Sequence, residues 1–265
     1  MSKSKLFLLA AVIGLASTLL VHAQDKPPRL TFEVASIKPS KPGAAAGGIK
    51  AMPGGQEYIA QNAPVKLIIS LMYKVPIRQI TGGPDWLNTD LYEIDAKADH
   101  SYNIDDLHTM FQNLLVDEFK MQFHKEVKEG SVYALTADKS GLKMKVNESA
   151  QDFEIPIKGG PNGTIIGARV PMQYLCWWLG QNVLQRDQRP VIDMTGLAGN
   201  YDFTLSFLPE LPPNFNTENP NLPPGFLDRP SIFDALKQQL GLKLEAQKGP
   251  VEYFVIDHIE KPAEN

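Results

Sequence analysis

Few residues of this 265-residue chain have the types and spacing that catalysis requires. Ser140 and Lys143 form an S-x-x-K sequence, in which a lysine can activate a serine, but the S-D-N and K-T-G partners are missing. The sequence also has no G-x-S-x-G, H-E-x-x-H, P-loop or dinucleotide-binding motif. Asp193 and Asp202 remain as carboxylates that could do acid/base work in a hydrolase of an unrecognised type.

The residues that could bind a metal or act as a nucleophile are scattered. His108 follows Asp105 by three residues on a predicted helix, but third and fourth ligands are not evident, so an exposed histidine beside an acidic helix start is expected. Cys176, the single cysteine, lies in an apolar stripe and is expected to be buried. Asp193-Met194-Thr195-Gly196 lacks the adjacent Asp-Thr of aspartic proteases. The sequence therefore predicts no metal and no cofactor.

Aromatic and charged residues near turns are better candidates for binding than for catalysis. Trp177 and Trp178 are adjacent on one predicted helix and cannot both point into one core, so one of them is expected at a rim or an interface. Trp86 follows a Gly-Gly-Pro turn, and the segment from Arg189 to Tyr201 combines a charge, a tight turn and an aromatic ring. The predicted binding residues are Trp86, Trp177, Arg189, Asp193 and Tyr201.

Hydrophobic periodicity predicts the elements that position these residues. A strand over 30–37 and a Gly/Ala/Pro-rich loop over 41–55 come first. The order then becomes helix, strand, strand, helix, strand, strand. The ranges are a helix opened by Pro64, strands at 78–81 and 91–96, a helix at 105–117, and strands at 119–124 and 131–137 joined by a polar turn at 128–130.

The second half repeats this order. Its predicted elements are a helix opened by Pro171, strands at 190–193 and 201–207, a helix capped by Ser231, and strands at 242–246 and 251–259 joined by a turn at 248–250. Val132 and Val251, which match in the two halves, are 119 residues apart. The halves differ by a Pro-rich insertion over 209–230, expected to be an exposed loop.

These patterns predict an α+β fold with two similar lobes, at 24–150 and 151–265, each with helices packed on a small, mostly antiparallel sheet. Chance repetition of a common helix–hairpin order is the alternative. The formal charge of −4 becomes −6 without Lys3 and Lys5, which argues against nucleic-acid binding.

The first 23 residues have the three parts of a secretory signal peptide. Lys3 and Lys5 precede an apolar run over 6–21, and Val21-His22-Ala23 provides small residues for cleavage after Ala23. The alternative is that the apolar run remains as a membrane anchor. The mature chain is expected in the periplasm or outside the cell.

Four ordered segments carry a resemblance to a known family. They are Phe32–Ser40, Leu114–Leu135, Arg189–Phe203 and Val255–Pro262. They resemble a large paralogous family of uncharacterised exported proteins from soil acidobacteria, some of whose members are fused to a membrane metallopeptidase of the antirepressor-sensor type. The resemblance implies an exported sensing or binding domain. The second half, from Met172 to Ile256, is also similar to the short N-terminal domain of secretins and TonB-dependent receptors, which are periplasmic interaction modules.

The sequence as a whole favours an exported, non-catalytic protein that binds, interacts or senses in the cell envelope. The expected partner is an envelope protein or a peptide, contacted for instance by strand addition at exposed edges. Two alternatives stay open: a secreted hydrolase that uses Asp193 and Asp202, and a small-molecule carrier.

Overall fold

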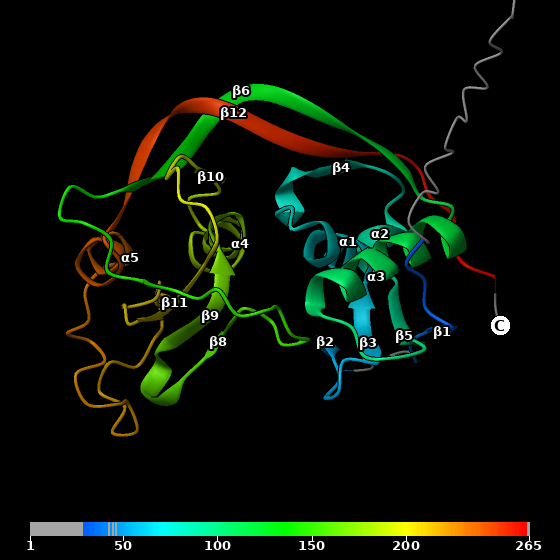
Figure 1. Ribbon diagram of the computed structural model, residues 1–265, viewed down its shortest axis with the longest axis horizontal. Helices are drawn as coiled ribbons and strands as arrows, with labels where there is room; N and C mark the ends of the chain where they lie inside the picture. The colour runs from blue at the N-terminus through cyan, green and yellow to red at the C-terminus, as the bar shows by residue number, and fades with distance from the viewer. Residues whose placement is uncertain (1–28, 42, 44, 46, 264–265) are drawn as a thin grey trace, which may run out of the picture.

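The computed structural model describes residues 29–41, 43, 45 and 47–263, so the predicted signal peptide and its cleavage site lie outside the described residues. The fold is a mixture of helices and several small sheets. Figure 1 shows two groups of elements joined across the top by one long two-stranded ribbon. Here the first group means β1 to β5 with α1 to α3, and the second group means β7 to β11 with α4 and α5.

The first group is built on an antiparallel sheet whose inner face is covered by helices. The strands, in sheet order, are β1 (Val34–Pro39), β5 (Leu91–Lys97), β3 (Glu57–Pro64) and β2 (Ile49–Ala51). The helices are α1 (Val65–Tyr73), the short η1 (Ile77–Gln79), α2 (Trp86–Thr89) and α3 (Ile104–Glu118). Their apolar stripes form a buried core with Tyr58, Ile94 and Phe254.

The second group has its own antiparallel sheet and its own core. The strands, in sheet order, are β7 (Lys145–Val146), β11 (Asn200–Leu205), β9 (Ile165–Pro171) and β8 (Ile157–Gly159). The helical elements are η2 (Pro161–Gly163), α4 (Met172–Trp178), the π-helical turn η3 (Leu179–Val183), α5 (Ile232–Ala235) and the π-helical turn η4 (Leu236–Leu240). Leu175, Leu205 and Leu236 are fully buried in this second core.

The ribbon consists of β6 (Gln122–Ala137) and β12 (Leu242–His258), which pair antiparallel along their whole length. At the first group, β4 (Ile80–Gly82) adds to β12 in parallel, and at the second group, β10 (Val191–Asp193) adds to β6 in parallel. The resulting sheet has the order β10-β6-β12-β4. Each end of the ribbon therefore belongs to a different core.

The ribbon corrects the prediction of turns at 128–130 and 248–250, because the backbone continues as strand through both segments. Gly130 and Gly249 lie directly opposite each other at the middle of the ribbon. Pro250 has no N–H, but this is tolerated because its backbone faces away from β6. Backbone groups alternate in direction along a strand, so Pro250 faces the same way as Glu252, whose carbonyl accepts a hydrogen bond from Gln79 on the side away from β6. In both segments, pairing between β6 and β12 outweighs the local preference of the sequence for a turn.

Several local predictions agree with the structure, and others need adjustment. The helix predicted around 105–117 is present, and the predicted cap Ser231 accepts from the Asp234 amide at the start of a short α-helix that passes into a π-helical turn. The first strand starts at Val34 rather than Leu30, because Phe32 instead packs edge-on against Phe111 with ring centroids 6.0 Å apart. The loop predicted over 41–55 includes the short strand β2.

Candidate functional site

A groove of about 430 Å³ lies where the two groups and the ribbon meet, and we call it the central groove. One wall comes from the end of α1 and from η1 in the first group, the other from α4 and β10 in the second group, and Pro250 and Glu252 come from β12. Two of the five predicted binding residues, Trp177 and Asp193, line it. The structure thus brings together side chains that the sequence separates.

The α4 wall contributes a tryptophan with an unsatisfied donor. Trp177 is 9% exposed and packs against Tyr174, with ring centroids 5.3 Å apart. Its indole Nε1 is buried without a hydrogen-bond partner in the described part of the chain. Buried indole N–H groups usually find an acceptor, so this unsatisfied donor is an exception in the packing of α4. The neighbouring Trp178 is partly buried.

Cys176 also lines the groove, and its thiol is buried, as predicted. Burial raises the pKa of Cys176, and the charge of Asp193 raises it further. A thiol that resists ionisation is a poor nucleophile and a poor metal ligand. The cysteine therefore acts as an apolar part of the wall.

The β10 wall is a strand edge that is covered at its start and free at its end. Arg78 binds the outward carbonyl of Arg189, and Gly180 lies beside the Val191 amide, whereas Asp193 is exposed. The amide of Tyr133 donates to the carbonyl of Pro190 at 2.8 Å, and the amide of Met194 donates to the carbonyl of Leu135 at 2.9 Å. In a parallel pair this pattern turns the N–H and C=O groups of Val191 and Asp193 away from β6. Among residues 29–41, 43, 45 and 47–263, nothing hydrogen-bonds to these four outward groups.

The exposed Asp193 side chain closes a turn directly after β10. Its Oδ1 atom accepts from the Thr195 amide at 2.9 Å and from the Thr195 hydroxyl at 2.7 Å. Within the described ranges, no lysine, arginine or histidine nitrogen lies within ion-pair distance of this carboxylate. By contrast, Lys74 and Glu252 in the groove are each neutralised, by Asp105 and Lys125 at 2.9 Å. Asp193 is thus the uncompensated charge of the groove.

Two consecutive residues of η1 tie the first group to the second group and to the ribbon, and we call this pair of residues the clasp. Arg78 donates from Nη1 to the Gly180 carbonyl and from Nη2 to the Arg189 carbonyl, both at 2.9 Å. Gln79 donates to the Glu252 carbonyl at 2.7 Å. Burial lowers the pKa of Arg78, and the charge of Asp187 opposes this shift. Sequence reasoning missed this clasp, because its acceptors are backbone carbonyls more than a hundred residues away.

The other predicted binding residues lie outside the groove lining. Arg189 pairs with Asp187 at 2.8 Å and stacks over the Tyr133 ring at 5.0 Å. Tyr201 is buried and donates its hydroxyl to the Ala198 carbonyl at 3.0 Å. Trp86 belongs to the first group and packs against Tyr92 with ring centroids 6.3 Å apart. Arg189 is next to the groove, whereas Tyr201 and Trp86 support local packing.

The two carboxylates of the hydrolase alternative lie in different sheets. Asp202 is on β11 and accepts from the Asn147 side chain at 2.8 Å and from the Arg169 amide at 2.9 Å. Desolvation raises the pKa of Asp202, but these hydrogen bonds together with the charges of Lys145 and Arg169 bring the pKa below its ordinary value. Asp193 is on β10, where its Oδ1 atom bonds to Thr195, whereas Asp202 links β11 to Arg169 of β9.

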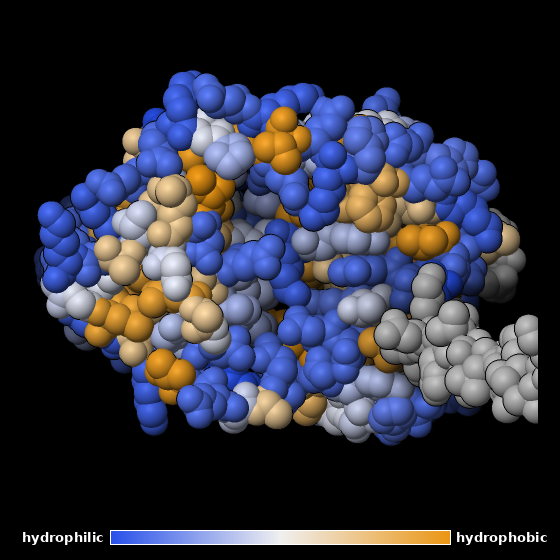
Figure 2. All heavy atoms as spheres, turned by 45° about the horizontal axis from the view of Figure 1, so that its top comes forward, coloured by the Kyte–Doolittle hydropathy of each residue, from blue (hydrophilic) through white to orange (hydrophobic). Residues whose placement is uncertain are grey.

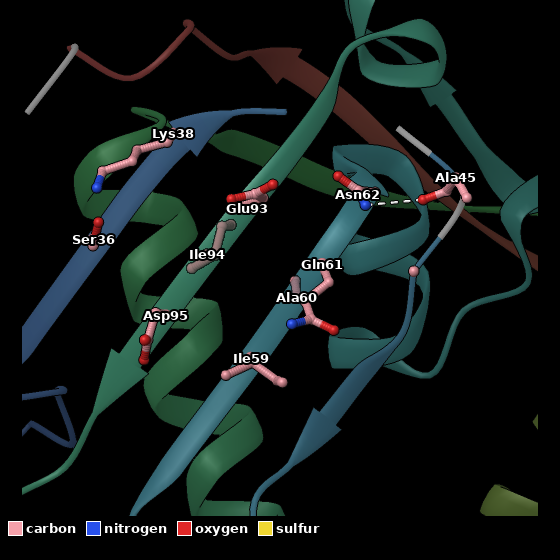
Figure 3. A pocket seen from close by; sticks show the side chains of 11 residues that line it. Ser36, Lys38, Ala45, Ile59, Ala60, Gln61, Asn62, Glu93, Ile94 and Asp95 are labelled. Atoms are coloured by element: carbon pink, nitrogen blue, oxygen red, sulfur yellow. Dashed lines mark hydrogen bonds between the residues drawn. The ribbon is translucent and has the colours of Figure 1, made fainter. Parts of the chain in front are cut away.

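A second hollow, of about 530 Å³, lies on the outer face of the first group's sheet. Figure 3 shows its polar side chains standing on neighbouring strands, while Ala45 leans over the rim and accepts a hydrogen bond from Asn62 at 2.9 Å. Lys38 faces Glu93 and Ser36 faces Asp95 across β1 and β5. Alternating charges on the open face of an antiparallel sheet are typical of a solvated surface.

His108 is the clearest correction among the candidate metal ligands, because it is buried rather than exposed. Its Nε2 atom lies 3.0 Å from the hydroxyl of Tyr58, and burial lowers its pKa to about 3. Within the described part of the chain, no three His, Cys, Asp or Glu side chains gather in a way that could hold a metal ion. None of the described helices has the length and apolar character needed to cross a membrane.

Comparison with known proteins gives a family. Neither the curated proteins nor the solved structures contain a match to this chain. A family model, described as "Protein of unknown function (DUF3738)", matches residues 66–259, which include the central groove and the whole ribbon. The chain therefore belongs to the DUF3738 family.

Proposed function

We propose that this protein is an exported, non-catalytic binding protein of the cell envelope, which captures an extended segment of a partner protein or peptide in the central groove. The observation that carries the proposal is the open edge of β10, where the outward backbone groups of Val191 and Asp193 have no partner among the described residues. An extended peptide can add to such an edge as a further strand.

The walls of the groove support this mode of binding. Main-chain hydrogen bonds give a strand its affinity, and side-chain contacts give it specificity. Trp177, Pro190 and Pro250 offer apolar contacts next to the β10 edge. Figure 2, in which the top of Figure 1 comes forward, shows a face that is mostly hydrophilic with hydrophobic residues in small patches. Such a surface suits recognition of a short segment better than docking on a large apolar partner.

The repeat predicted from the sequence forms part of the proposal. We propose that the chain is an internal duplication with lobes at 24–150 and 151–265. Support comes from the matching orders β3-α1-β4-β5-α3-β6 and β9-α4-β10-β11-α5-β12. Gly130 and Gly249 also support it, because they face each other in the ribbon. They are 119 residues apart, the same separation as that of Val132 and Val251.

Export is proposed from the signal-like sequence before Gln24. The measurement is N-terminal sequencing of the protein recovered from a periplasmic or medium fraction after expression of the whole chain. Cleavage after Ala23 is expected. Recovery of uncleaved chain in the membrane fraction would favour the anchored alternative.

The strand-addition proposal is tested with a Val191→Pro variant. The outward N–H of Val191 does not serve the β10–β6 ladder, so proline should remove one docking donor without opening the fold. The chain from Gln24 onward is panned against random short peptides displayed on phage, and selected peptides are measured by isothermal titration calorimetry. Val191→Pro should weaken binding at least about tenfold.

The matched control is Ala35→Pro, in the edge strand β1 and away from the groove, because Ala35 has the same orientation as Pro39 and its N–H faces away from β5. This variant should bind the selected peptides as the parent chain does. Circular dichroism of both variants checks that the fold is kept. Selection of no peptide, or equal binding by Val191→Pro and the parent chain, would refute the proposal.

A further inference from the structure

The central groove carries a charge that no described residue balances. Lys74 and Glu252 each have an ion-pair partner at 2.9 Å, whereas the exposed carboxylate of Asp193 has no cationic partner in the described part of the chain. The Oδ1 atom of Asp193 is occupied by Thr195, but the Oδ2 atom accepts no hydrogen bond from a described residue. A negative charge thus stands at the end of the open β10 edge.

The position of this charge matters more than its presence. Asp193 is itself a residue of β10 whose backbone N–H and C=O face outward. A strand paired with this edge would bring the side chains of its own residues alongside the Asp193 side chain, as cross-strand neighbours. Opposite charges at such positions stabilise a strand pair, and like charges destabilise it.

The residues around Asp193 in the central groove are suited to a cationic side chain. Trp177 presents an aromatic ring, and Pro190 and Ile192 present apolar surface. A lysine or arginine side chain can lay its aliphatic stem on such a surface while its charged end reaches a carboxylate. An acidic group in the partner at this position would instead be repelled by the charge of Asp193.

From this geometry we infer that the segment bound at the β10 edge is a cationic one, with a lysine or arginine side chain that pairs with the carboxylate of Asp193. The inference rests on the proposed function and adds the chemical class of the partner segment. Electrostatic complementarity of this kind contributes to selectivity and to the rate of association.

An Asp193→Asn variant isolates the charge. Asparagine keeps the Oδ1 acceptor for Thr195, so the turn after β10 should be preserved while the negative charge is removed. The chain from Gln24 onward and the variant are panned in parallel against the same random peptide library on phage. The parent chain should enrich lysine and arginine at one position of the selected peptides, and the variant should lose that enrichment.

Synthetic peptides then quantify the effect. A selected peptide should bind Asp193→Asn about five- to tenfold more weakly at low salt, and replacing its cationic residue by alanine should cause the same loss in the parent chain. The two changes together should cost no more than either alone. The control is Asp228→Asn, an exposed acid in the Pro-rich segment, which should leave binding unchanged.

The outcomes separate the two proposals. Peptides without lysine or arginine whose binding still depends on Val191 would overturn the cationic partner and keep strand addition. Failure of Val191→Pro to weaken binding would overturn strand addition itself. If light scattering shows a dimer that Val191→Pro dissociates, the edge is occupied by a second copy of the chain, and both the peptide partner and its charge are refuted.

Discussion

The helices of the two groups differ in regularity. In the first group, α3 is a continuous helix of 15 residues, capped by Asn103 and carrying a full apolar stripe. In the second group, α4 and α5 last 7 and 4 residues before each passes into a π-helical turn. Such turns are uncommon and often occur at functional sites. The open β10 edge and the buried indole of Trp177 lie in this irregular group.

The two groups also differ in how each uses the short strand that it adds to the ribbon. The short strands β4 and β10 have equivalent places at opposite ends of the ribbon. However, the segment before β4 supplies Arg78, which bonds to the second group, and Gln79, which bonds to the ribbon, while β10 lines the groove. The first group holds the second in place, and the second carries the edge at which we propose binding.

The largest expected effect concerns the core of the first group at acid pH. The folded pKa of His108, about 3, lies below the ordinary value of 6.5. Stability from the neutral ring is therefore complete above pH 6.5 and is lost as pH falls from 6.5 toward 3, by up to roughly 5 kcal/mol. Guanidinium unfolding at several pH values should show this slope, and His108→Gln should flatten it. An unchanged slope in the variant would contradict the assignment.

A smaller loss is expected when the clasp between the groups is removed. Arg78→Ala leaves the carbonyls of Gly180 and Arg189 without their donor, so the free energy of unfolding should fall by about 2–4 kcal/mol. Hydrogen exchange should accelerate at the ends of η3 and β10 before it accelerates in α3. Arg186→Ala, which removes an exposed arginine, should cost under about 1 kcal/mol. Equal losses in the two variants would argue against a clasp.

The smallest expected change in stability comes from removing the cap of one helix in each group. Asn103 accepts from the Asp106 amide at 2.9 Å, and Ser231 accepts from the Asp234 amide at 3.2 Å. Asn103→Ala and Ser231→Ala should each lower the free energy of unfolding by about 1 kcal/mol, with the larger loss at the shorter bond. Urea unfolding measures both. A greater loss from Ser231→Ala would show that the irregular helix depends more on its cap than the long helix does.

Local signals in the sequence were sufficient for much of the fold. The stripe and the acidic first turn located α3, and the alternation of apolar and polar residues located β5, because each pattern is complete within its own element. The mixed α and β character followed from these elements. The buried state of Cys176 was also predictable, since its neighbours one turn away are apolar.

Features that depend on distant partners were not predictable. The polar segment at 128–130 has the composition of a turn, and only its pairing with β12 makes it strand. His108 has acidic neighbours in sequence, but in the fold its ring faces Tyr58 from β3. Asp193 and Trp177 were found as candidates from their types alone, whereas the open edge between them depends on how β10 pairs with β6.

The ribbon also has a consequence for the order in which the protein can be completed. The first group's strand β4 adds to residues 254–256, so this group is finished only by the last strand of the chain. During synthesis the core of the first group must wait for Phe254, Ile256 and Ile259, which are buried in it, until these residues have been made. Loss of the final strand would therefore disrupt the beginning of the molecule as much as its end.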